Sequence, residues 1–146
     1  YIIKNERLVF VDDYAHHPEE LRALITGAKT LFRQKKCTVI FQPHLYSRTR
    51  DLADGFAEVL DLADEVILLP IYPARELPIA GVSSEMILER MKNDNKQVLE
   101  KEELMNWIAN DYGTTLNKEF GEVLITAGAG DIDVLVEPIM NELKNI

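Results

Sequence analysis

The sequence predicts an α/β fold, with a doubly wound, mostly parallel sheet, an N-terminal β-hairpin and helices on both faces. Short, unbroken apolar runs alternate along the chain with amphipathic segments of helical period. Unbroken apolar runs are typical of strands that are buried on both faces, and their alternation with helices is typical of parallel sheets. The length of 146 residues fits a single domain that spans residues 1–146.

The first elements are a hairpin and a helix. Residues 1–4 and 7–12 are rich in β-branched and aromatic side chains, and the Asn5-Glu6 turn separates them, which favours two antiparallel strands. From Pro18 the apolar residues recur with helical spacing as far as Phe32. Proline is well tolerated in the first turn of a helix, so we expect a helix to begin at Pro18.

The rest of the chain continues the alternation. Strands are predicted at residues 37–42, 65–69, 96–99 and 122–126, and helices over Leu52–Ala63, from a Ser83 cap to Met91, over 101–110 and over Ile132–Leu143. Pro138 should kink the last of these helices, since proline cannot donate a backbone hydrogen bond. The proline-rich loop at 70–81 is too irregular for a simple connection, and we interpret it as functional or as a lid.

The composition excludes several classes of protein. Lys and Arg total 16 and Asp and Glu total 25, giving a net charge of −9, so we expect neither a nucleic-acid partner nor a membrane partner. The single cysteine, Cys37, cannot form an internal disulfide, and no apolar run approaches the roughly 20 residues of a membrane span. We therefore expect a cytoplasmic protein. Because the chain begins at Tyr1 without an initiator Met or a signal peptide, we expect a fragment.

Polar residues gather where the predicted strands end. In parallel α/β sheets, ligands bind beyond the carboxyl ends of the strands. The polar groups after the strands are Asp12-Asp13-Tyr14-Ala15-His16-His17, His44 with Tyr46-Ser47-Arg48-Thr49-Arg50, Arg75-Glu76, and Gly128-Ala129-Gly130-Asp131. We therefore expect a polar site along this edge of the sheet.

The residues alone leave alternatives open. Asp12 and Asp13 could cap a turn, His16 and His17 could ligate a metal, and His44 could be a buried core histidine. Arg48 and Arg50 could be solvated charges at a helix start, although cations there are unfavourable against the helix dipole, which favours an anionic ligand. The Gly128 turn lacks the third glycine of a dinucleotide fingerprint. The residue types thus predict an α/β domain that binds an anionic, polar ligand.

Two long motifs add a resemblance. The stretch Asp12-Asp13-Tyr14-Ala15-His16-His17-Pro18, followed about 25 residues later by Phe41-Gln42-Pro43-His44-Leu45-Tyr46-Ser47-Arg48-Thr49, closely resembles the C-terminal domain of the Mur ligase family. Ile71-Tyr72-Pro73-Ala74-Arg75-Glu76, Pro78-Ile79 and Gly128-Ala129-Gly130-Asp131-Ile132 are similar to the same family. Within it, the resemblance is greatest to the members that add L-alanine to UDP-N-acetylmuramate.

The resemblance implies a Rossmann-like domain of a larger enzyme. In this family, a first domain binds the UDP-sugar, a central domain carries the P-loop, and the third domain closes over the site. The implied partners are L-alanine, ATP, UDP-N-acetylmuramate and the missing central domain. ATP and Mg²⁺ would act in the full-length enzyme and be held mainly by that central domain, with no cofactor bound tightly to this chain. We therefore expect the chain to be inactive alone.

The resemblance also assigns roles to individual residues. Arg48 would bind the L-alanine carboxylate, His16 and His44 would bind alanine and act as the catalytic groups that manage the proton of its amine, and Tyr14 would wall the pocket. Asp13, with Asp12, would bind the ribose and adenine part of ATP, and no residue is expected to ligate a metal. Some relatives carry Arg where this chain has Leu45, so Arg48 alone, Arg50 or a residue of another domain would supply the cation.

Other classes of function stay open at this point. One is a stand-alone, metal-dependent phosphohydrolase that uses Asp12, Asp13, His16 and His17. Another is a non-catalytic regulatory module. A metal at these residues would favour the hydrolase, and an exposed apolar patch away from the strand ends would favour the module.

Overall fold

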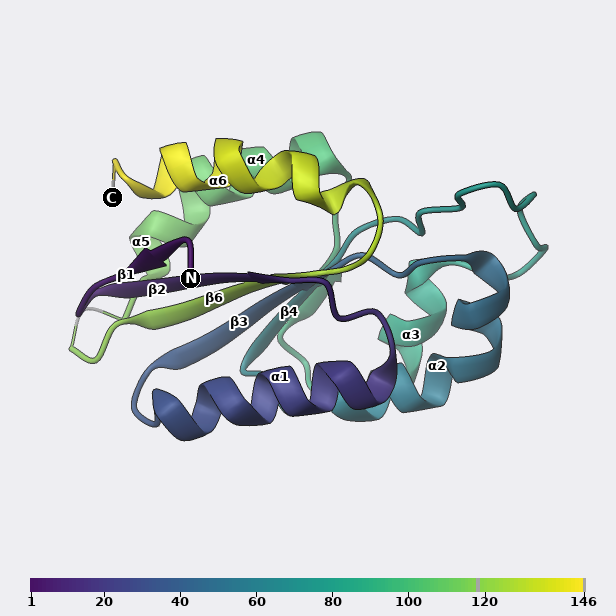
Figure 1. The fold of residues 1–146 in the computed structure, drawn as a ribbon, viewed down its shortest axis with the longest axis horizontal. Helices are drawn as coiled ribbons and strands as arrows, with labels where there is room; N and C mark the ends of the chain where they lie inside the picture. The colour runs from purple at the N-terminus through teal and green to yellow at the C-terminus, as the bar shows by residue number, and fades with distance from the viewer. Residues whose placement is uncertain (118, 146) are drawn as a thin grey trace.

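A six-stranded sheet forms the centre of the molecule in the computed structural model, which describes residues 1–117 and 119–145. The strand order is β1-β2-β6-β3-β4-β5. Only β1 is antiparallel to its neighbour, β2, and the other pairs are parallel (Figure 1). The strands are β1 (Ile3–Lys4), β2 (Leu8–Asp13), β3 (Lys36–Phe41), β4 (Glu65–Leu68), β5 (Lys96–Val98) and β6 (Glu122–Ala127).

Helices cover both faces of the sheet, as predicted (Figure 1). On one face lie α1 (Pro18–Leu31), α2 (Tyr46–Leu60) and α3 (Ser84–Arg90). The other face carries α4 (Lys101–Trp107), a π-helical turn η1 (Ile108–Tyr112), α5 (Gly113–Thr115), a 3₁₀ turn η2 (Asp131–Leu135) and α6 (Val136–Leu143). The doubly wound α/β architecture and the N-terminal hairpin are therefore confirmed.

The strands are buried on both sides because their successive residues enter different cores. In β3, Val39 packs in the core beneath α1 and α2, whereas Ile40 packs in the core beneath α4 and α6. Both side chains are fully buried. Burial of each such side chain contributes about 1.5–3 kcal/mol. Both cores therefore hold the strand ends in fixed positions.

Some details differ from the sequence prediction. Leu31 is 69% exposed rather than buried, because it is the last residue of α1. Ala63 is buried but lies beyond the end of α2. Ser83 occupies the cap position of α3 without making a side-chain hydrogen bond. These differences fall at helix ends, which are the least regular parts of the pattern.

The region around Pro138 also differs from the prediction of one kinked helix. The 3₁₀ turn η2 ends at Leu135, and α6 begins at Val136. Pro138 thus lies in the first turn of α6, where a missing N–H leaves no helix bond unmade. The chain changes helix type before the proline instead of bending at it.

None of the helices in the described residues is both long enough and apolar enough to cross a membrane.

Candidate functional site

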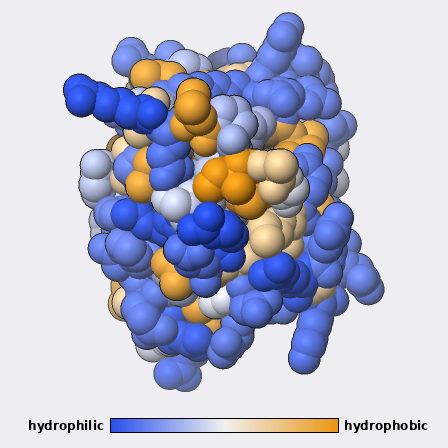
Figure 2. Space-filling view, turned by 90° about the vertical axis from the view of Figure 1, so that its right-hand side faces the viewer, coloured by the Kyte–Doolittle hydropathy of each residue, from blue (hydrophilic) through white to orange (hydrophobic). Residues whose placement is uncertain are grey.

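The carboxyl ends of four parallel strands meet at one edge of the sheet. β2, β6, β3 and β4 all run toward this edge, which lies to the right in Figure 1. Figure 2 looks onto it and shows apolar side chains at the centre of a largely hydrophilic face. The polar residues predicted to follow these strands therefore do share one edge.

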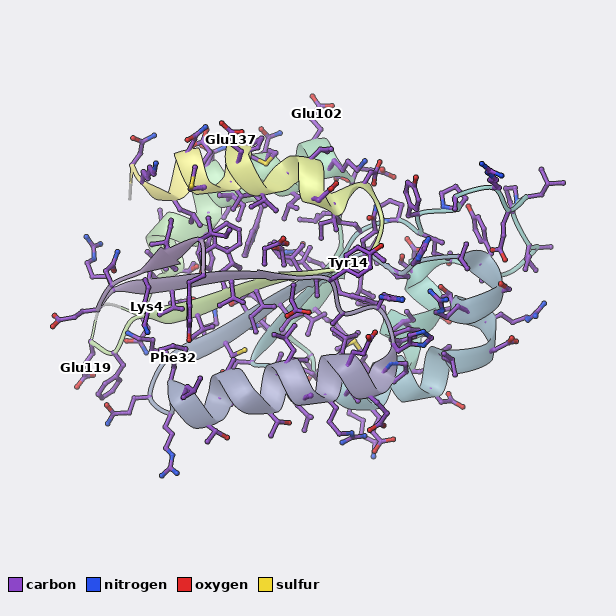
Figure 3. The ribbon with its side chains drawn as sticks, in the orientation of Figure 1. Lys4, Tyr14, Phe32, Glu102, Glu119 and Glu137 are labelled. Atoms are coloured by element: carbon purple, nitrogen blue, oxygen red, sulfur yellow. The ribbon has the colours of Figure 1, made fainter. Side chains whose placement is uncertain are left out.

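Two histidines from different strand ends lie together at this edge. The ring of His16, after β2, lies 6.0 Å from the ring of His44, after β3, centroid to centroid. Tyr14 lies 5.4 Å from the His16 ring by the same measure and projects at the carboxyl end of β2 (Figure 3). Its side chain is 69% exposed, so it can contact a ligand from the solvent side.

Short-range hydrogen bonds fix the His16 segment before α1. A ring nitrogen of His16, Nδ1, lies 2.9 Å from the carbonyl oxygen of Tyr14. The carboxylate oxygen Oε1 of Glu20 accepts the backbone N–H groups of His16, at 3.1 Å, and of His17, at 3.0 Å. These bonds lower the pKa of Glu20, since they stabilise its charged form. Glu20 is thus an acidic cap that holds His16 at the start of α1.

Arg48 lies against His44 in the first turn of α2. An Nη1 nitrogen of Arg48 lies 3.4 Å from Nδ1 of His44. Burial and the Arg48 charge lower the pKa of His44, because both disfavour the imidazolium form. Among the described residues, Arg48 has no carboxylate within salt-bridge distance, whereas Nε of Arg50 is 2.8 Å from Asp51. Of the two arginines, Arg48 is therefore the one available to an anionic ligand.

Asp12 and Asp13 point to opposite faces of the sheet. The Asp12 carboxylate accepts the hydroxyl of Thr126 at 2.7 Å, and burial raises its pKa. Asp13 lies on the α1 side, and its carboxylate accepts the backbone N–H of Ala15 at 2.8 Å. Successive residues of a strand point to opposite faces of the sheet in this way. Only Asp13 therefore faces the side on which His16 lies.

The sequence placed Asp131 at this edge but did not reveal the polar group that it forms with Gln42 and Lys101. Gln42 donates from Nε2 to Asp131 at 2.7 Å and accepts the backbone N–H of Ile132 at 3.0 Å. Lys101 donates to the other oxygen of Asp131. Burial would raise the pKa of Asp131, but the hydrogen bonds from Lys101 and Gln42 outweigh it and lower the pKa. These side chains, with Tyr72, line an open groove of about 480 Å³.

Gly130 has a steric role in this group. A Cβ atom at Gly130 would lie 2.6 Å from Oε1 of Gln42 and 2.6 Å from Cβ of Tyr72. The position therefore has no space for a side chain. The glycines after β6, which the sequence singled out, let this turn approach the ends of β3 and β4.

A possible set of metal ligands also forms, but not the one that the hydrolase hypothesis requires. Ligand atoms of His16, His17 and Glu20 lie within 4.8 Å of one another. Glu20 is already bound by backbone N–H groups, and Asp12 and Asp13 each accept a hydrogen bond elsewhere. In the described residues, the four predicted hydrolase ligands do not converge, so the structure does not favour that alternative.

A larger hollow, of about 600 Å³, lies away from this edge. It is lined by residues of the hairpin and by Leu116, Leu143 and Lys144. None of the predicted site residues is among them. The chemistry that the sequence predicts therefore belongs to the carboxyl edge and not to this hollow.

The fold and its edge together define a class of protein. This is a Rossmann-like α/β domain that presents histidine and arginine side chains at the carboxyl ends of its strands, where such folds bind ligands. The chain belongs to the Mur ligase family, since residues 1–130 match the family model described as "Mur ligase, glutamate ligase domain".

Curated relatives support the same family. The chain is 51% identical over 139 residues to a UDP-N-acetylmuramate–L-alanine ligase of Cytophaga hutchinsonii. The match covers 95% of this chain and 28% of that protein. A protein of the same name from Phocaeicola vulgatus is 49% identical over 143 residues, covering 97% of this chain and 30% of the relative. This chain thus spans less than a third of the length of these relatives.

Solved structures share the fold. The UDP-N-acetylmuramate-alanine ligase of Thermotoga maritima matches 94% of this chain at a TM-score of 0.61 and 29% identity, and 26% of that protein is covered. A murein peptide ligase of Psychrobacter arcticus matches 97% of the chain at a TM-score of 0.71 and 19% identity, with 28% of that protein covered. A separately crystallised domain from Haemophilus ducreyi is covered to 93%, at a TM-score of 0.63 and 16% identity over 94% of this chain. The last match indicates that this fold forms without further domains.

Proposed function

We propose that this chain is part of an ATP-dependent ligase that joins L-alanine to UDP-N-acetylmuramate. The observation that carries the proposal is the cluster of His16, His44 and Arg48, in a chain that is 51% identical over 139 residues to a relative of that name. In the reaction, the muramoyl carboxylate takes the γ-phosphoryl group of ATP, which releases ADP. The amine of L-alanine then attacks the acyl phosphate, phosphate leaves, and an amide forms.

The cluster matches the chemistry of a small amino acid. Arg48, which has no carboxylate partner in the described part of the chain, can bind the L-alanine carboxylate through two parallel N–H groups. His44 has a lowered pKa and is therefore neutral near pH 7, the form that accepts a proton. A free amine is the nucleophile, so a neutral imidazole nearby favours its formation.

His16 and Tyr14 complete the proposed pocket. The His16 ring faces that of His44 across the strand ends, so both can contact one small ligand. Tyr14 stands beside His16 and would close the pocket on the solvent side. Asp13, on the same face of the sheet as α1, would accept hydrogen bonds from the ribose hydroxyls of ATP.

The described residues do not suit Mg²⁺. This ion prefers oxygen ligands in octahedral geometry, whereas the set that converges here contains two imidazoles and a carboxylate that already acts as a helix cap. Asp131 is bound to Lys101 and Gln42. We therefore assign no step to Mg²⁺ in this chain and infer that other parts of the enzyme hold it.

A substrate panel tests the proposal. The full-length protein that contains this chain is incubated with ATP, Mg²⁺ and UDP-N-acetylmuramate, and phosphate release is measured with L-alanine, L-glutamate or an L-alanyl peptide as acceptor. We expect release with L-alanine and formation of UDP-N-acetylmuramoyl-L-alanine by mass spectrometry. Preference for the peptide would instead indicate a murein peptide ligase and contradict the proposal.

A further inference from the structure

The backbone between His44 and α2 is strained. Leu45 has a φ of 73° and a ψ of 136°. A bulky side chain rarely adopts a positive φ, and such a conformation costs on the order of 1–3 kcal/mol. Leu45 connects His44 to the helical turn that carries Arg48. Its conformation therefore sets how these two side chains face each other, and the surrounding structure must stabilise it.

A segment of the proline-rich loop, which we call the 72–76 strap, holds this backbone. The backbone N–H of Leu45 donates to the carbonyl of Tyr72 at 2.9 Å, and the N–H of Tyr72 donates to the carbonyl of Pro43 at 2.9 Å. Tyr72 thereby forms a parallel bridge with His44, and their rings lie 5.6 Å apart. The strap is thus paired with this segment on both sides of His44, and the second bond is made by the backbone of Leu45 itself.

The far end of the strap binds the first turn of α2. The Glu76 carboxylate accepts the backbone N–H of Ser47 at 3.1 Å through one oxygen, and the Ser47 hydroxyl through the other. These bonds lower the pKa of Glu76, so it is ionised at neutral pH.

Glu76 supplies an N-terminal cap that the residues of α2 do not supply themselves. The helix has no side-chain cap and no acidic residue in its first turn, where Arg48 opposes the dipole. A carboxylate at this end satisfies an unpaired N–H group and supplies the favourable charge. Glu76 therefore stabilises the turn that presents Arg48, from a distant part of the chain.

We propose that Glu76 is a positioning residue for the L-alanine site. Its carboxylate fastens the 72–76 strap to α2, and the fastened strap keeps Leu45 in the conformation that orients His44 and Arg48. Glu76 itself contacts no substrate in this account. The inference rests on the proposed function only for the identity of the amino acid. The contact between Glu76 and Ser47 can be measured without any ligand.

The kinetic test uses Glu76→Ala and Glu76→Gln in the full-length protein, with Leu77→Ala as the control. Leu77 is in the same loop, is 84% exposed and carries no charge. We expect Glu76→Ala to raise the KM for L-alanine about tenfold, equivalent to about 1.4 kcal/mol, with kcat changed less than about threefold. Glu76→Gln keeps an acceptor for Ser47 and should have a smaller effect. An unchanged KM in both variants overturns the positioning role.

A second measurement, on this chain, separates the inference from the proposed function. Amide exchange of Ser47 and the NMR titration of His44 are compared in the same variants. In Glu76→Gln we expect faster exchange at Ser47 and a lower pKa of His44, because the negative charge of Glu76 raises that pKa. Leu77→Ala should change neither. Wild-type exchange and titration in Glu76→Gln overturn the inference, even if the enzyme proves to use another acceptor.

Discussion

His44 lies with its Nδ1 atom 3.4 Å from the guanidinium of Arg48, which is one helical turn further along the chain. This proximity joins the end of a strand to the start of a helix in a single polar group. The charge of the guanidinium disfavours a proton on the imidazole. The neutral imidazole in turn carries no negative charge that would neutralise the guanidinium. The pair thus combines a proton acceptor with an anion-binding group.

The first prediction concerns the titration of His44. Burial and Arg48 hold its pKa below the usual 6.5, so NMR should show protonation below that pH. In Arg48→Ala the pKa should rise. Between the folded pKa and 6.5 the unfolded chain binds more protons than the folded one, so this histidine lowers stability as the pH falls through that window. A His44 pKa at or above 6.5 would contradict the structure.

The second prediction concerns Glu122, which is fully buried at the start of β6. Burial raises its pKa above the usual 4.5, and its charge contributes to the raised pKa of the buried Tyr112. The folded chain therefore binds the proton more tightly than the unfolded chain, and stability falls as the pH rises through the folded pKa. Glu122→Gln removes this loss and keeps an acceptor for Asn117.

Urea unfolding at two pH values checks this prediction. We expect Glu122→Gln to raise the unfolding free energy at pH 7 by about 1 kcal/mol, the usual scale of single substitutions, with the gain vanishing below pH 4.5. Glu65→Gln is the matched control, since it breaks the 2.9 Å ion pair with Lys36 and should give no gain. Destabilisation of Glu122→Gln at pH 7 would show that the charged form is favoured.

The third prediction separates Asp12 from Asp13. The family resemblance gives both a role at ATP, but the two carboxylates lie on opposite faces of the sheet. Asp13→Ala in the full-length protein should raise the KM for ATP about tenfold, the scale of a lost hydrogen bond to a charged group. Asp12→Asn, which can still accept from Thr126, should leave it within about threefold. Unchanged ATP kinetics in Asp13→Ala would remove the ribose role.

The fourth prediction concerns the chain by itself. Its polar edge carries the groups that we propose bind an amino acid, but the P-loop sequence that cradles a triphosphate is absent from this sequence. We expect cooperative unfolding, no ATP hydrolysis and no tight ATP binding. Calorimetry that gives a micromolar ATP affinity would contradict this prediction.

The sequence predicted the edge of the sheet well, for a physical reason. Unbroken apolar runs mark strands that enter two cores, and parallel strands end on the same side. His16, His44 and Arg48 each follow such a run closely, so their convergence is a consequence of local pattern. The same logic could not separate Asp12 from Asp13, because their divergence becomes visible only once the strand is known to extend to Asp13.

The remainder depends on contacts that no periodicity encodes. β6 inserts between β2 and β3, although β3 follows β2 in the chain. Gln42 meets Asp131, and Glu76 meets Ser47, through segments far apart in sequence. Such pairings follow from the strand order and from loop closure, which residue spacing does not report. The positive φ of Leu45 is a further example, since leucine gives no sign of it.

The most direct test of the account is the KM for L-alanine in Arg48→Ala, compared with Arg50→Ala, in the full-length protein. Arg48 has no carboxylate partner in the described residues, whereas Arg50 is paired with Asp51. We expect Arg48→Ala to raise the KM at least 30-fold, or about 2 kcal/mol, and Arg50→Ala to change it less than about threefold. An unchanged KM in Arg48→Ala would contradict the assignment of this edge as the L-alanine site.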